Sequence, residues 1–294
     1  MTDAQRTPGD KQGTLAGRLV LVTGASRGIG LESARALAER GARLVLVARE
    51  AAALKEASAS LAGDGHRWLA FDVSDEAAWR PHLGDLDELA GLVTAAAVLD
   101  PVGPIGSYSP SAFQRTIEIN LFGTYLAVHS CLPALRAGKG SVVTFGGGGA
   151  TSPLPRYDAY ASSKAAVARL TENLAYAMAP QGIRVNCVAP GFVATSIHEA
   201  TLAAGPSAAG DDYYERTRRE LADGGFPVGE AADLVCTLLE GVPFTGKLVS
   251  ARWDPWRDRD FHERLASDQN LATVRRIDGR AFGSSVREGA AYKC

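Results

Sequence analysis

The chain has 294 residues, of which 46% are hydrophobic, 22% charged and 7% aromatic, an ordinary composition for a globular protein. Its 31 lysines and arginines nearly balance 33 aspartates and glutamates, and the net charge of -2 excludes the strongly basic surface typical of nucleic-acid-binding proteins. No apolar run approaches the roughly 20 residues of a membrane-spanning helix, and residues 1–14 lack a secretory signal. The four cysteines lie far apart without disulfide-like spacing. We therefore expect a cytoplasmic protein that binds neither nucleic acid nor membrane.

Short apolar runs alternate with helix-like segments along most of the chain, after a polar segment at residues 1–16 that we expect to be a flexible tail. Strands are predicted at residues 19–22, 44–47, 68–71, 91–98, 141–145, 184–188 and 247–250. Helices are predicted at residues 31–40, 54–61, 75–83, 113–136, 157–178 and 230–240, and residues 197–226 combine short helical stretches with turns. This alternation predicts an α/β fold: one doubly wound Rossmann-type domain over residues 17–252, with a parallel sheet and helices on both faces. Residues 253–294 form a C-terminal extension too short for a second domain.

A glycine-rich loop at residues 23–30 joins the first predicted strand to the first helix. Gly24 permits a tight turn, while Gly28 and Gly30 let the backbone approach a pyrophosphate and let the helix pack on the sheet. The helix N-terminus then offers unpaired N–H groups and a partial positive charge to the phosphates. Because the loop lies between an apolar strand and a helix, it predicts dinucleotide binding better than a simple turn.

The residues at the end of the second predicted strand indicate which nucleotide is bound. A protein that binds NAD usually has an acidic residue there, which accepts a hydrogen bond from the ribose 2′-hydroxyl. This chain has Ala48 and Arg49 instead, and Arg27 lies in the glycine loop. Two guanidinium groups suit a 2′-phosphate, although Glu50 is an unfavourable neighbour and Arg49 could be a solvated strand-end residue. The sequence therefore favours NADP over NAD.

Five ordered motifs resemble the short-chain dehydrogenase/reductase family over roughly residues 15–252: residues 23–30, 72–73, Asn120, Tyr160 with Lys164, and residues 190–195. The resemblance implies an NAD(P)-dependent oxidoreductase that transfers a hydride between a nicotinamide and the carbonyl or secondary alcohol of a small-molecule substrate. It also implies a homodimer or homotetramer. The expected cofactor-binding residues are Gly24, Ser26, Arg27, Gly28, Ile29, Gly30, Arg49, Asp72, Val73, Ala95, Tyr160, Lys164, Pro190, Gly191, Val193 and Thr195.

Tyr160 and Lys164 are expected to be catalytic, because residues four apart on a helix share one face. A tyrosine with a pKa near 10 exchanges protons poorly at neutral pH. An ammonium about 4 Å away, at an effective dielectric of about 20, contributes up to ~4 kcal/mol, enough to lower that pKa by about three. The resemblance adds Asn120, which supports a water linked to the lysine in the proton relay. Two alternatives remain. Tyr160 and Lys164 could be an unrelated pair on a helix surface, and the Asn120 amide could bond to backbone.

Two stretches depart from the family pattern. Residues 94–97 read Thr-Ala-Ala-Ala where the family has Asn-Asn-Ala-Gly, and Gly147 occupies the position of the catalytic serine, 13 residues before Tyr160. Loss of a hydroxyl that holds the substrate oxygen costs on the order of 10²–10³ in rate. Thr144, Thr151, Ser152, a backbone N–H or a substrate hydroxyl could replace it. The departure also leaves open a non-redox enzyme of the epimerase, dehydratase or retro-aldol type that uses Tyr160 as acid and base, or a non-catalytic cofactor-binding protein.

Further residues are weaker candidates for substrate binding. They are Arg156, Tyr157, His198, Glu199, Tyr213, Tyr214, Arg216, Arg218 and Arg219. They favour an anionic or hydroxyl-rich ligand, although a helix start and a solvated amphipathic helix explain them as well. The five histidines lack metal-ligand spacing, so no metal is expected.

The C-terminal extension gives two further expectations. The extension resembles the tail of one subgroup of the family. Membership of that subgroup would imply a sugar, cyclitol or similar polyhydroxylated substrate. Trp253 and Trp256 are expected to pack on a neighbouring subunit, before a short helix at residues 262–271.

Overall fold

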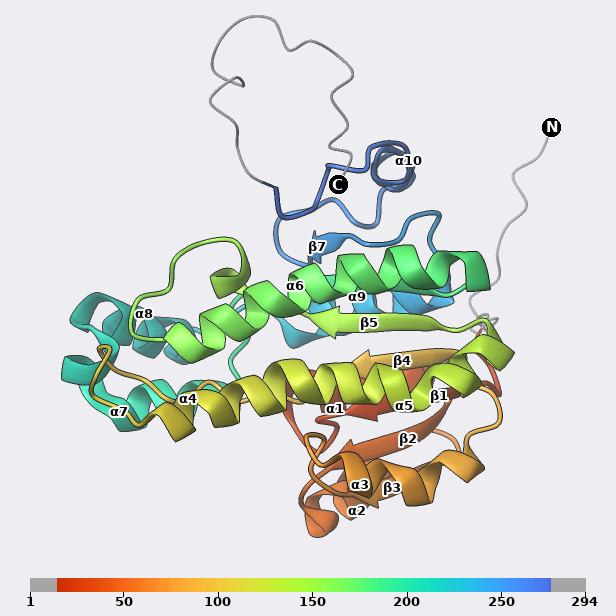
Figure 1. The fold of residues 1–294 in the computed structure, drawn as a ribbon, viewed down its shortest axis with the longest axis horizontal. Helices are drawn as coiled ribbons and strands as arrows, with labels where there is room; N and C mark the ends of the chain where they lie inside the picture. The colour runs from red at the N-terminus through yellow and green to blue at the C-terminus, as the bar shows by residue number, and fades with distance from the viewer. Residues whose placement is uncertain (1–14, 276–294) are drawn as a thin grey trace, which may run out of the picture.

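The computed structural model describes residues 15–275, without the side chains of residues 83 and 85. Seven parallel strands form one sheet in the order β3-β2-β1-β4-β5-β6-β7 (Figure 1). They are β1 (Leu19–Thr23), β2 (Arg43–Ala48), β3 (Arg67–Ala70), β4 (Gly91–Thr94), β5 (Ser141–Phe145), β6 (Arg184–Ala189) and β7 (Leu248–Ser250). The strand order reverses between β1 and β4, so the predicted doubly wound Rossmann-type sheet is confirmed.

Two apolar cores lie on opposite faces of the sheet, because successive strand residues point alternately to its two sides. On one face, Val20 and Val22 pack with α1 (Gly28–Glu39), α2 (Ala51–Ala59) and α9 (Val228–Glu240). On the other face, Leu21 packs with α5 (Gly123–Gly138) and α6 (Asp158–Met178). The chain therefore has helices on both faces, as predicted.

Among the remaining elements, several boundaries differ from those predicted from the sequence. The remaining helical elements are α3 (Glu76–Trp79), η1 (Arg80–Asp85), α4 (Pro110–Ile117), η2 (Glu118–Phe122), η3 (Gly148–Ala150), η4 (Ala179–Gln181), η5 (Ser196–His198), α7 (Glu199–Ala209), α8 (Asp211–Ala222) and α10 (Arg259–Ser267). The single helix predicted at 113–136 is divided by the π-helical turn η2. The predicted strand 91–98 ends at Thr94, because Ala96 donates its N–H to Thr23 Oγ1 at 3.3 Å. Helix α10 begins before residue 262, since Asp258 caps it by accepting from the Asp260 N–H.

Helices α7 and α8 lie together at the end of the molecule toward which the strands point (Figure 1). The N-terminal ends of α4 and α6 reach the same end. Because the carboxyl ends of parallel strands carry the ligand sites of such sheets, α7 and α8 are positioned to cover a site there. Within residues 15–275, no helix is both long and apolar enough to cross a membrane.

The ends of the described chain pack on the domain itself. Leu15 is buried in the same core as Val20, so packing begins inside the segment predicted to be flexible; residues 1–14 lie outside the described residues. Trp256 and Leu265 are buried in that core, whereas Trp253 is 76% exposed. The expectation that both tryptophans pack on a neighbouring subunit is therefore wrong for Trp256, whose indole N–H is also bonded within the chain, to the Ala251 carbonyl at 3.1 Å.

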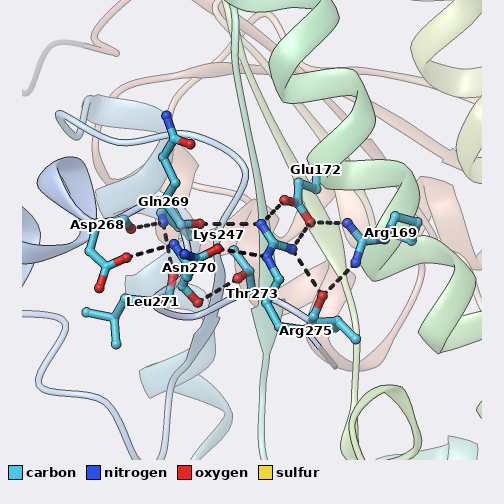
Figure 2. A network of polar contacts seen from close by, with 10 residues as sticks. Arg169, Glu172, Lys247, Asp268, Gln269, Asn270, Leu271, Thr273 and Arg275 are labelled. Atoms are coloured by element: carbon cyan, nitrogen blue, oxygen red, sulfur yellow. Dashed lines mark hydrogen bonds and ion pairs between the residues drawn. The ribbon is translucent and has the colours of Figure 1, made fainter. Parts of the chain in front are cut away.

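A polar network joins residues 268–275 to α6 and β7 (Figure 2). The buried carboxylate of Glu172 accepts hydrogen bonds from Arg169 and Arg275, the latter at 2.9 Å from Nη1 to Oε2. Lys247 Nζ donates to the Leu271 carbonyl at 3.0 Å. The hydrogen bond from Arg275 is the main reason why the pKa of Glu172 lies below its ordinary value. At the edge strand β7, the Leu248 N–H donates to the Ala272 carbonyl at 2.8 Å, so this segment covers the edge of the sheet.

Candidate active site

A cleft of about 690 Å³ opens at the carboxyl ends of β1 to β4, where the strand order reverses. Eleven of the predicted cofactor-binding residues line it: Gly24, Ser26, Arg27, Gly28, Ile29, Gly30, Arg49, Asp72, Val73, Ala95 and Thr195. The others, Tyr160, Lys164, Pro190, Gly191 and Val193, are not among its lining residues, and neither is Asn120. The cleft therefore brings together most of the predicted nucleotide site.

Other lining residues were not predicted. At or just after the strands they include Ala48, Glu50, Phe71 and residues 96–100, and on the covering segment Ser196, Ile197, Ala200 and Ala203. Ala53 in α2 and Ile119 in η2 also line the cleft, as does Glu199, which was already a weaker candidate from the sequence. Position after a strand could have identified the first group, because strand ends meet at this edge. The second group follows no motif and enters the cleft only because α7 folds back over it.

The glycine loop has little room for side chains. A Cβ on Gly24 would lie 2.6 Å from the Ala96 nitrogen, and Gly24 has a φ of +66°. A Cβ on Gly30 would lie 2.3 Å from the Gly24 carbonyl oxygen. Helix α1 begins without a side-chain cap and has no acidic residue in its first turn. Its first N–H groups and the positive end of its dipole are therefore available to an anion such as a phosphate.

Arg27 and Arg49 are exposed and line the cleft, one in the glycine loop and one after β2. Within residues 15–275, neither guanidinium has a hydrogen-bond or ion-pair partner. Glu50 also lines the cleft. Unpaired guanidinium groups beside a phosphate-sized loop give the cleft a local positive charge.

Asp72 is held by neighbouring side chains at the cleft wall. Its Oδ1 accepts from the Ser74 hydroxyl at 2.7 Å, and its Oδ2 accepts from Arg115. Partial burial favours a higher pKa, but the bonds from Ser74 and Arg115 outweigh burial and lower the pKa of Asp72. The carboxylate is thus charged and oriented, with Val73 beside it in the cleft.

Asn120 connects the segment after β4 to α6. The buried amide exchanges two hydrogen bonds with the Val98 backbone, at 2.8 Å and 2.9 Å, and donates to Ser163 Oγ at 3.0 Å. Thr23 Oγ1 accepts a hydrogen bond from the Ala96 N–H. Thr23 and Asn120 together therefore fix the position of the segment after β4, where residues 94–97 lack the family's asparagines. The amide thus bonds to backbone, as the alternative predicted, and it also reaches Ser163 on α6; its predicted support of a water linked to Lys164 stays a prediction.

Tyr160 and Lys164 share one face of α6, as their spacing predicts. Lys164 Nζ lies 5.7 Å from the centroid of the Tyr160 ring and donates to the Phe145 carbonyl at 3.0 Å. Burial lowers the pKa of Lys164 to about 8. Burial, followed by the nearby Tyr213, raises the pKa of Tyr160, the opposite of the expected direction. Loss of hydration on burial is the larger cause of this shift, and it favours the protonated phenol.

Gly147 lies next to the phenol oxygen of Tyr160. A Cβ on Gly147 would be 3.2 Å from Tyr160 Oη, which is where a serine side chain would begin. Thr144 is fully buried, and its hydroxyl lies 2.6 Å from the Thr171 hydroxyl, so it faces the core. Thr151 and Ser152 are exposed in the following turn.

Arg156 and Tyr157 hold the segment that covers the active site. Tyr157 is fully buried and donates from its hydroxyl to Thr201 Oγ1 at 3.0 Å. Arg156 Nη1 donates to the Ser207 carbonyl at 2.6 Å. Both candidates therefore bind α7, so these groups are engaged within the protein.

The charged candidates on α8 pair along their own helix. Arg216 lies 3.9 Å from Glu220, Arg218 lies 3.2 Å from Glu215, and Arg219 Nε donates to the Glu215 carbonyl at 3.4 Å. This is the solvated helix that the sequence left as an alternative. Of the remaining candidates, His198 stacks on Phe192 with centroids 4.0 Å apart, and Glu199 lines the cleft. Tyr213 and Tyr214 pack in the cluster around Tyr157.

The segment after β6 lies between the glycine loop and the covering helices. Thr195 Cγ2 is 3.4 Å from the position of a Cβ on Gly28. Val193 pairs with Gly225, and Gly191 lies against Arg252 and Phe226. Residues 190–195 thus pack against residues 225–226 and Arg252, and their C-terminal end, Thr195, lies beside the glycine loop.

A family model described as short chain dehydrogenase matches residues 18–204. The chain is 35% identical over 189 residues to cis-4-hydroxycyclohexanecarboxylate dehydrogenase of Sinomonas cyclohexanicum, covering 62% of this chain and 76% of the relative. It is 35% identical over 208 residues to D-threitol dehydrogenase of Mycolicibacterium smegmatis, covering 68% of this chain and 80% of the relative. A crystal structure of an actinorhodin polyketide ketoreductase variant with NADPH is similar with a TM-score of 0.69 and 26% identity, covering 80% of this chain and 95% of that one.

Proposed function

The chain belongs to the short-chain dehydrogenase family, a family of oxidoreductases, and from this premise we propose that it is an NADP-dependent dehydrogenase or reductase. Its substrate is a small molecule with a carbonyl or secondary alcohol, of the sugar, cyclitol or other polyhydroxylated class. The observation that carries the proposal is the pair of unpaired guanidiniums, Arg27 and Arg49, in the cleft beside the glycine loop. The name of a relative that acts on D-threitol supports the polyhydroxylated class.

The residues present fit a nicotinamide dinucleotide, because the glycines at 24 and 30 permit a tight loop and helix α1 begins beside it without a side-chain cap. We assign the pyrophosphate to this loop and the α1 N-terminus, and the 2′-phosphate to Arg27 and Arg49. Asp72 and Val73 flank the adenine, residues 190–195 follow the nicotinamide, and Lys164 holds its ribose. When bound, the nicotinamide supplies or accepts the hydride.

Tyr160 transfers the proton to or from the substrate oxygen. Its raised pKa keeps the phenol protonated, as a proton donor to a carbonyl must be. Lys164, with a pKa lowered to about 8, is poised to change charge near neutral pH, which suits a group that tunes the phenol. Asn120 steadies the segment after β4 and, through Ser163, the first turn of the helix that bears both residues.

Turnover with a defined panel of alcohols tests this function. The panel is D-threitol, myo-inositol and cis-4-hydroxycyclohexanecarboxylate, each with NADP⁺ and with NAD⁺, followed by the absorbance of the reduced nicotinamide. We expect turnover with a polyhydroxylated member and faster turnover with NADP⁺. Turnover of none of them, combined with tight nucleotide binding, would favour a non-catalytic cofactor-binding protein.

Gly147 favours one alternative function. A site without the family hydroxyl suits a non-redox enzyme of the epimerase, dehydratase or retro-aldol type, in which Tyr160 moves a proton. Such an enzyme would convert its substrate with no net change in reduced nicotinamide, as product analysis would detect.

We further propose a cytoplasmic homodimer or homotetramer. Phe122 and Tyr125, each 41% exposed, stack with centroids 6.1 Å apart, and this exposed aromatic pair supports assembly. Free, buried thiols at Cys131, Cys187 and Cys236 suit a reducing compartment. Light scattering gives the mass in solution, and a monomer would contradict the proposed assembly.

A further inference from the structure

The hydroxyl missing at Gly147 leaves the substrate oxygen with one protein donor, Tyr160. None of the three hydroxyl residues near Gly147 in sequence is a good replacement. Thr144 is engaged with Thr171, while Thr151 and Ser152 are exposed beyond η3. We therefore expect a replacement side chain, as distinct from a backbone N–H or a substrate hydroxyl, in a segment distant in sequence.

Tyr213 on α8 carries a hydroxyl in such a distant segment. Its ring packs on Tyr157 with centroids 4.8 Å apart, and Tyr157 lies three residues before Tyr160, at the start of the same helix. Tyr160 and Tyr213 belong to one apolar cluster, with Leu154 and Ile197 also packed in it. Covering the active site with α8 thus brings a second phenol to the end of α6 where Tyr160 lies.

The two phenols differ from Tyr157 in their hydrogen bonding. Tyr157 donates to Thr201, whereas neither the Tyr160 nor the Tyr213 hydroxyl has a partner among residues 15–275. Burial raises the pKa of Tyr213, so this hydroxyl keeps its proton at neutral pH. Tyr213 is a half-buried donor without a partner in the same cluster as Tyr160, and such a donor can donate to a ligand.

We propose that Tyr213 supplies the substrate-holding hydroxyl that Gly147 lacks, so that the substrate oxygen is bound between the phenols of Tyr160 and Tyr213. The inference rests on the proposed function. Tyr213 donates a hydrogen bond and keeps its proton, while the proton that the oxygen gains on reduction comes from Tyr160. The role of the missing serine thus passes to a residue on the covering segment, which couples catalysis to the position of α8.

Four variants test the inference by kinetics with the panel above: Tyr213→Phe, Tyr214→Phe, Gly147→Ser, and Tyr213→Phe combined with Gly147→Ser. Phe at 213 keeps the ring packing and removes only the donor, so kcat/KM should fall on the order of 10²-fold. Tyr214→Phe is the matched control, since Tyr214 packs in the same cluster, and should change kcat/KM less than threefold. Gly147→Ser should restore at least tenfold in the Tyr213→Phe background, because it returns a hydroxyl next to Tyr160 Oη.

A substrate-free measurement covers the case in which no panel member is turned over. In protein labelled with ¹³Cζ-tyrosine, Tyr213→Phe should shift the Tyr160 resonance and lower the Tyr160 pKa, whereas Tyr214→Phe should change neither. The inference would be overturned if the Tyr160 pKa is the same in wild type and in Tyr213→Phe, or if Tyr213→Phe has wild-type kinetics. Tyr160→Phe separates the two proposals. If Tyr160→Phe is inactive while Tyr213→Phe is unaffected, only the role of Tyr213 fails; if Tyr160→Phe is also unaffected, the proposed function fails as well.

Discussion

The candidate active site has a nucleotide half, which is the cleft, and a proposed substrate half around Tyr160, which lies outside the lining of that cleft, and the two are built in different ways. The nucleotide half is made by backbone. A Cβ built on Gly24 or Gly30 would lie 2.6 Å or less from other main-chain atoms, and the N-terminus of α1 has no side-chain cap. The proposed substrate half is made by side chains from distant segments: Tyr157, just before α6, packs on Tyr213 of α8, and Tyr160 of α6 belongs to the same cluster. A site made of backbone requires particular residues in one short continuous motif. A site made of side chains instead requires that distant helices pack together.

Replacing Tyr160 by Phe should give the largest effect and should affect the substrate half alone. The change removes the proton-transfer group, so turnover should fall by about 10²–10⁴-fold. Nucleotide affinity should stay within about twofold, because the glycine loop and both arginines are untouched. Steady-state kinetics and a fluorescence titration with NADPH measure the two effects, and a variant with wild-type kcat would rule out the catalytic assignment.

Replacing Gly30 by Ala should damage the nucleotide half instead. The new Cβ would lie 2.3 Å from the Gly24 carbonyl oxygen, so the loop must move. Such overpacking costs about 1–3 kcal/mol, and NADPH affinity should fall with it. Urea unfolding measures the loss of stability.

Gly229→Ala is the control for the Gly30 variant. Gly229 lies in the first turn of α9, where an added Cβ would meet nothing within 4 Å. This variant should be neutral or up to about 1 kcal/mol more stable. Equal responses of the two variants would show that the tight loop has no special importance.

This contrast explains how much could be predicted from sequence. All seven strands and the glycine loop were predicted, because apolar runs and glycine spacing are local signals. The break at η2 was missed, since Asn120 pairs with Val98 across the fold rather than with its own helix. Tyr213 appeared only among the weak candidates, because its neighbours Tyr157 and Tyr160 are more than fifty positions away in sequence. The raised Tyr160 pKa was also missed, since burial cannot be judged from the spacing of Tyr160 and Lys164.

Glu172→Gln extends the comparison to the C-terminal segment, which is attached by charged side chains. The carboxylate accepts from Arg169 and Arg275 while buried, so its loss should cost about 2 kcal/mol at neutral pH. Because its folded pKa is lowered, the stabilisation is complete above the unfolded value of about 4.3 and disappears as pH falls through the folded pKa. Urea unfolding at neutral and at acidic pH should show the difference between wild type and variant shrinking in acid.

The control for this variant is Glu263→Gln. Glu263 pairs with Arg259 at 3.1 Å on the exposed face of α10, and such pairs contribute about 0.2–1 kcal/mol. A loss for Glu172→Gln that is no larger than this, or that is the same at every pH, would contradict a stabilising role for the buried network.

The relative affinity for NADPH and NADH tests the central claim most directly. Arg27 and Arg49 should make NADPH bind at least about tenfold more tightly, a difference of about 1.4 kcal/mol, and Arg49→Ala should weaken NADPH binding while leaving NADH binding unchanged. Fluorescence titration of wild type and variant with both nucleotides gives the four dissociation constants. Equal affinities in the wild type, or equal losses for both nucleotides in the variant, would contradict recognition of the 2′-phosphate by these two arginines.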